Sequence, residues 1–114
     1  MRRLAATCLI LAMIAAALLA PRPGLAADPP EIPLTIEKAQ FQPAEVRVKS
    51  GAPFVLVITN KDSAAAEFES KELRVEKVVP AGKTVKVRVR ALKPGDYPFF
   101  NDFNQKTTGK IVAE

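Results

Sequence analysis

Short runs in which apolar and polar side chains alternate recur along most of this chain, and they constrain its fold more than any other feature. The strictest run is 84–90, where three valines alternate with a threonine, a lysine and two arginines. Because successive side chains of a strand point to opposite faces, the pattern predicts a strand with one face in a core and the other in water. Weaker versions of the same pattern occupy residues 34–38, 45–49 and 73–79.

The segments between these runs are rich in proline, glycine, asparagine and aspartate, and no segment after the leader has the length of a helix. Residues 54–59 are apolar on both faces, as a central strand requires. Residues 97–112 predict a strand, a short polar loop and a closing strand. Together, seven or eight short strands bounded by turn residues predict an all-β fold, an antiparallel β-sandwich.

The start of the chain predicts a secretory signal peptide. Arg2 and Arg3 supply a basic beginning, residues 4–20 carry no charge, and small residues at 24–27 suit a signal peptidase. We therefore expect export to the periplasm, with retention of the leader as a membrane anchor as the alternative.

Cleavage after Ala26 or Ala27 would leave one small domain. The chain then divides into a signal peptide at 1–27, a proline-rich segment at 28–33 and a domain at 34–114, which we expect to be soluble. The remaining chain is too short for a second core, so stability must come from the packing of one sandwich.

Composition excludes several classes of function. The sequence has no histidine, and its single cysteine and two methionines, Cys8, Met1 and Met13, all lie in the leader. Nucleophile and base pairs of serine and cysteine hydrolases, and zinc sites made of thiolate and imidazole, therefore cannot form. We expect no enzyme. Lys and Arg number 17 against 12 Asp and Glu, but part of the excess lies in the leader, so no nucleic-acid binding is expected.

Two pairs of polar side chains flank aromatic residues and suggest a metal site. Glu67 and Glu69 lie on either side of Phe68, and Asp102 and Asn104 repeat this arrangement around Phe103. In an extended segment each pair points to one face, although the three alanines at 64–66 would also suit a helix. The two pairs, brought together, would offer oxygen ligands for Mg²⁺, Ca²⁺, Mn²⁺ or ferric iron. The alternative is that these are ordinary strand ends, with the aromatic in the core and the acids in water.

Basic residues form a second candidate site. Lys86, Arg88 and Arg90 share the polar face of the run at 84–90 and would suit an acidic partner or an anionic lipid surface. The alternative is a solvated strand face whose charges discourage pairing with other sheets.

Four motifs together resemble the cupredoxins, the plastocyanin-like Greek-key sandwiches. These motifs are Asn-Lys-Asp at 60–62, Val-Pro-Ala-Gly-Lys-Thr at 79–84, Pro-Gly-Asp-Tyr-Pro-Phe at 94–99 and Gly-Lys-Ile-Val at 109–112. The resemblance covers residues 34–114 and implies a copper site made by histidine, cysteine and a weak axial ligand. Those positions fall near Ala66, at Asn101 and at Thr107, so no type 1 copper and no blue-copper electron transfer is expected.

Within that superfamily, residues 67–73 and 99–104 are most similar to EfeO-type cupredoxin-like domains. Such domains accompany bacterial periplasmic iron-uptake permeases and are thought to bind or pass on iron or copper. The resemblance implies Glu67, Glu69 and Asp102 as ligands, and it puts Asn104 where the group commonly has histidine.

The chain is thus expected to be an exported accessory protein that binds an iron or copper ion weakly beside an inner-membrane iron permease or another periplasmic protein. The alternative is a metal-free interaction module that docks through Lys86, Arg88 and Arg90.

Overall fold

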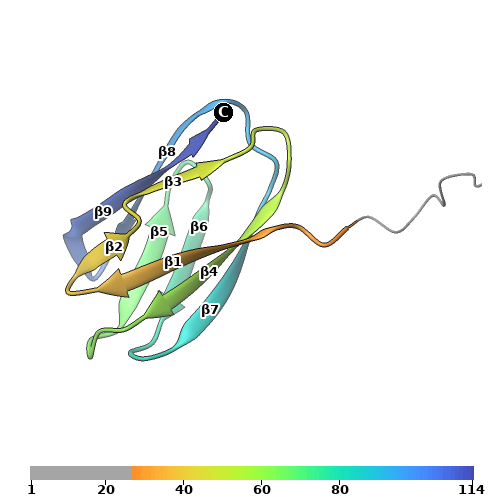
Figure 1. Cartoon of the computed structure of the whole chain (residues 1–114). Helices are drawn as coiled ribbons and strands as arrows, with labels where there is room; N and C mark the ends of the chain where they lie inside the picture. The colour runs from red at the N-terminus through yellow and green to blue at the C-terminus, as the bar shows by residue number, and fades with distance from the viewer. Residues whose placement is uncertain (1–26) are drawn as a thin grey trace, which may run out of the picture.

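The computed structural model of this chain describes residues 27–114 (Figure 1). The predicted signal peptide, apart from Ala27, lies outside the described residues. In the described part the chain forms strands and no helix, and no segment there is a helix able to cross a membrane. The strands are β1 (Glu31–Glu37), β2 (Gln40–Gln42), β3 (Glu45–Val48), β4 (Phe54–Asn60), β5 (Ala66–Ser70), β6 (Val75–Val79), β7 (Thr84–Val89), β8 (Gly95–Asn101) and β9 (Asn104–Ala113).

These strands form two facing sheets, so the predicted all-β sandwich is confirmed. One sheet has the order β2-β1-β4-β7 and the other β3-β9-β8-β5-β6 (Figure 1). The pairing is not antiparallel throughout, because β1 pairs with β4, and β3 with β9, in parallel. Alternation along a strand reveals the face on which a side chain lies, but it does not reveal whether the neighbouring strand runs parallel or antiparallel. The sequence therefore did not predict the two mixed sheets.

Strand β1 begins at Glu31, three residues before the predicted start of the domain at Leu34. Pro33 lies within the strand, where it is opposite Val57 of β4. Strand β2 pairs with β1 only from Thr35 onward. A proline is tolerated at such an edge because no neighbour on that side requires its missing N–H.

The core is built around three phenylalanine rings from different strands. Phe41 meets Phe99 edge to face with ring centroids 4.8 Å apart, and Phe68 lies 5.0 Å from Phe99. Gly109 makes room for this cluster, since a Cβ there would lie 2.5 Å from the Phe99 ring and 2.8 Å from the Ala44 carbonyl oxygen. Burial of Phe68 in the core fixes the direction of its neighbours on β5 and turns them to the outer face.

Candidate metal site

The outer face of the five-stranded sheet carries a group of three carboxylates. Strand β5 is extended as predicted, and its buried residues are Ala66, Phe68 and Ser70. Glu67 and Glu69 alternate with them and are half-buried on the opposite face. The sheet therefore places the first predicted acid pair side by side, pointing away from the core.

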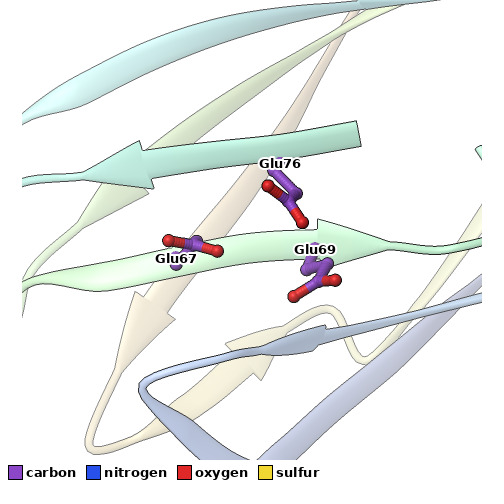
Figure 2. Close-up of side chains that lie close together, drawn as sticks. All are labelled: Glu67, Glu69 and Glu76. Atoms are coloured by element: carbon purple, nitrogen blue, oxygen red, sulfur yellow. The ribbon is translucent and has the colours of Figure 1, made fainter. Parts of the chain in front are cut away.

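Strand β6 adds a third carboxylate, which the sequence pattern did not predict. Glu76 lies directly opposite Glu69 across the antiparallel β5–β6 pair. One carboxylate oxygen from each of Glu67, Glu69 and Glu76 lies within 4.8 Å of the other two (Figure 2). The sequence feature that could have revealed Glu76 is the turn after Ser70. Pairing of Ser70 with Val75 makes a hairpin, and that register puts Glu76 opposite Glu69.

Asp102 lies beside this group, at the turn that follows β8. Its backbone N–H donates a 2.9 Å hydrogen bond to the Glu67 carbonyl oxygen, and its carboxylate accepts one of 3.1 Å from Gln105 Nε2. Desolvation at its half-buried position raises the pKa of Glu69 above the ordinary value, and the negative charges of Asp102, Glu76 and Glu67 raise it further. The charged form of Glu69 is thus disfavoured by three acidic neighbours on the same area of the sheet.

Asn104, the predicted fourth ligand, lies elsewhere. It is exposed at the start of β9, and it pairs in register with the buried Asn101 rather than with a residue of the outer face. Together with Asn101, Phe103 and Ala66 it lines a separate cavity of about 280 Å³ at one end of the sandwich. The structure therefore brings Glu67, Glu69 and Asp102 together, and it leaves Asn104 on the far side of the β8–β9 turn.

The predicted basic row, made by Lys86, Arg88 and Arg90, has members that differ in their contacts. Lys86 and Arg88 are exposed on β7, but Lys86 Nζ lies 2.7 Å from Glu31 Oε1 in an ion pair. Arg90 follows the strand and donates to the carbonyl oxygens of Leu73, at 3.4 Å, and Glu72, at 3.5 Å. Arg88 is the member of the row for which residues 27–114 provide no ion-pair or hydrogen-bond partner.

Two buried polar side chains, Asn101 and Thr107, occupy positions that the cupredoxin resemblance gives to copper ligands, and Asn101 also lines the cavity of about 280 Å³. Asn101 Oδ1 accepts hydrogen bonds from the backbone N–H of Glu67, at 2.9 Å, and of Phe103, at 3.1 Å. Thr107 Oγ1 donates to the Ala39 carbonyl oxygen at 2.6 Å. The polar atoms here are thus already engaged with the backbone.

Comparison with known proteins establishes the family of this fold. Residues 8–113 match the cupredoxin-like domain family. The chain belongs to this family. A curated relative is the uncharacterised protein RP394 of Rickettsia prowazekii (strain Madrid E), 38% identical over 82 residues, with 72% of this chain and 66% of the relative covered. This chain therefore spans slightly less than two thirds of that relative's length.

Solved structures support the same fold. The metal-binding domain of the Cu(I)-exporting P-type ATPase CopA of Streptococcus pneumoniae, with Cu(I), has a TM-score of 0.64 at 15% identity, covering 74% of this chain and 84% of that one. A purple cupredoxin of Nitrosopumilus maritimus has a TM-score of 0.55 at 13% identity, covering 72% and 98%. Amicyanin of Paracoccus versutus has a TM-score of 0.58 at 18% identity, covering 79% and 85%. At these identities the likeness concerns the fold alone.

The cupredoxin-like fold implies a copper ion, but the residues at the expected positions do not fit one. Ala66 offers a methyl group, and Asn101 offers an amide oxygen that already accepts two N–H groups. Thr107 donates its hydroxyl hydrogen to Ala39. Type 1 copper requires a thiolate and imidazoles, none of which the described chain contains.

Proposed function

We propose that this cupredoxin-like protein binds a hard metal ion weakly through Glu67, Glu69 and Glu76, with Asp102 beside them. One observation carries the proposal: three carboxylates converge within 4.8 Å, and in the described part of the chain none of them forms an ion pair. Like charges directly opposite on paired strands destabilise a sheet. A bound cation would remove this repulsion, because it would be attracted to all three groups at once.

The ligand set selects the kind of metal. Carboxylate oxygens suit Mn²⁺, Mg²⁺, Ca²⁺ or ferric iron, whereas Cu(I) prefers sulfur. A site on an open strand face keeps water on the metal, so we expect a dissociation constant of about 10⁻⁴ to 10⁻³ M, as in the weaker exported calcium sites. Such an affinity suits a metal that is passed on rather than one held permanently.

We further propose a role as an accessory to iron or copper transport in the periplasm. Support comes from the resemblance of residues 67–73 and 99–104 to EfeO-type domains and from the predicted signal peptide at 1–27. The likeness to the metal-binding domain of a Cu(I)-exporting ATPase agrees with a metal-handling role, although the donors here are oxygens. On this proposal the partner is an inner-membrane iron permease or another periplasmic protein.

Titration with Mn²⁺, followed by calorimetry and by the electron paramagnetic resonance of free Mn²⁺, tests the site. The variant Glu67→Gln/Glu69→Gln/Glu76→Gln keeps the shape of each side chain and removes its charge, and it should weaken Mn²⁺ binding at least about tenfold. Glu72→Gln is the matched control, because Glu72 is exposed on the neighbouring turn. An absence of Mn²⁺ binding at millimolar ion, or equal binding by the triple variant, would remove the proposal.

A further inference from the structure

A shallow groove of about 730 Å³ crosses the outer face of the same sheet, next to the carboxylates. It exists because strand pairing is interrupted there. Strands β5 and β8 share only two register pairs, and β3 covers β9 only from Lys110 onward. The floor between them is mostly apolar, and it is formed by Pro98, Phe99, Phe100, Thr108 and Gly109.

The groove and the carboxylates adjoin each other. Phe100, on the groove floor, lies directly opposite Glu69 across the β5–β8 pair. Lys71 lines the groove and also lines a second depression of about 430 Å³, which contains Glu69, Glu76 and Arg74. An occupant of the groove would therefore touch an apolar floor and Lys71, and at the Phe100 end it would lie next to Glu69. Glu45 and Lys110, which also line the groove, form an ion pair with each other.

The size and the charges of this surface indicate more than a bare ion. A groove of about 730 Å³ is in the range of small-molecule sites, which measure roughly 300–1,000 Å³. A free organic acid would be drawn to Lys71 but repelled by the carboxylates of Glu69 and Glu76. A metal held by that acid reverses the repulsion, because its positive charge then faces the glutamates.

We propose that the groove binds the flat organic part of a metal chelate, in which a carboxylate oxygen that is not bound to the metal faces Lys71 and the metal reaches Glu69. The inference rests on the proposed metal site and names the form in which the metal arrives. The cargo would be a complex of a hard cation with an aromatic hydroxy acid or a ligand of similar chemistry. The apolar floor would contribute contact area, and the glutamates would complete the coordination of the metal.

Ferric salicylate is the probe, because salicylate is a flat aromatic acid and its iron complex absorbs visible light. We expect the wild-type protein to bind ferric salicylate at least about tenfold more tightly than salicylate alone, as measured by calorimetry and by the change in visible absorption. Lys71→Gln and, separately, Phe100→Ala should weaken binding of the complex about five- to tenfold. Neither variant should weaken Mn²⁺ binding, because Phe100 carries no charge and loss of the Lys71 ammonium beside Glu69 removes a repulsion of the cation. Lys93→Gln is the matched control, since Lys93 is an exposed lysine that does not line the groove.

The outcomes separate the two proposals. If Mn²⁺ binds but ferric salicylate is indifferent to Lys71→Gln and Phe100→Ala, the metal site stands and the chelate proposal fails. Equal binding of salicylate with and without iron also overturns it, since the groove would then be a site for organic acids alone. If the wild-type protein binds no Mn²⁺, the proposed metal site itself fails. Lys71 is exposed, so its variant remains informative even if Phe100→Ala does not fold.

Discussion

The two halves of the outer face of the five-stranded sheet differ in whether their charged side chains form ion pairs. On the half made by β3, β9 and β8, Arg47 lies 3.1 Å from Glu114 and 3.3 Å from Glu45, and Lys110 lies 3.3 Å from Asp96. On the half made by β5 and β6, three glutamates converge without a lysine or arginine partner in the described residues. Both halves lie on the same face of one sheet, so the difference comes from which side chains the strands bring together there.

Register explains it. On β6 the side chains alternate, so Glu76 joins the glutamates while Lys77 lies opposite the inward-facing Phe68. A shift of β6 by one residue would exchange them and give the acids a cation. The repulsion is therefore specific to this pairing and is tolerated in it. The face thus neutralises its charges on one half and concentrates them on the other, where the cation site is proposed.

The largest expected effect comes from weakening the junction between β8 and the acidic half of the sheet, which is made by β5 and β6. Strand β5 meets β8 through only two register pairs, and Asn101 Oδ1 reinforces that junction by accepting from Glu67 and Phe103. Asn101→Ala leaves both N–H groups without this acceptor, so we expect a loss of about 2 kcal/mol in the free energy of unfolding, measured with urea. Asn104→Ala, an exposed neighbour, should change it by less than about 0.5 kcal/mol. Equal losses would mean that the junction does not depend on Asn101.

Charge reversal of Glu76 should give the acidic half an ion pair like those of the other half. Glu76→Lys places an ammonium opposite Glu69, so Mn²⁺ affinity should fall at least about tenfold while stability rises by about 0.5 kcal/mol. Glu72→Lys makes the same change of charge on the neighbouring turn and serves as the control. Retained Mn²⁺ binding in Glu76→Lys would show that the three glutamates do not act as one site.

The sequence anticipated one part of the acidic half, made by β5 and β6, and missed another part, for a physical reason. Alternation around Phe68 predicted that Glu67 and Glu69 lie on the same face, and the structure agrees, because a strand has only two faces. The alternation did not reveal Glu76, because the position of Glu76 depends on the length of the turn between β5 and β6. It also did not reveal that Asn104 lies at the end of the sandwich, because that position depends on the irregular pairing after Phe100. Local pattern thus predicts the face, and long-range register decides which residues meet on it.

Metal-free stability should depend on pH through Glu69. Its pKa in the folded chain lies above the ordinary 4.5, first through desolvation and then through the charges of Asp102, Glu76 and Glu67. The folded chain thus binds this proton more tightly than the unfolded chain, and the folded state loses stability as rising pH ionises the group. With a chelator present, the free energy of unfolding of the wild type should fall relative to Glu69→Gln as the pH rises above the ordinary pKa of 4.5. A relative rise above that pH would contradict the effect of the neighbouring acids on Glu69.

The smallest effect is expected on the paired half. Lys110 Nζ lies 3.3 Å from Asp96 and 3.6 Å from Glu45, and its side chain is well exposed. Lys110→Met keeps most of the apolar stem and removes the charge, so the loss should not exceed about 0.5 kcal/mol and should vanish in molar salt. Chemical denaturation in urea at low and high sodium chloride measures both values. A loss as large as that of Asn101→Ala would show that charge pairing holds this half of the sheet together, and the contrast with the acidic half would then be one of stability rather than of binding.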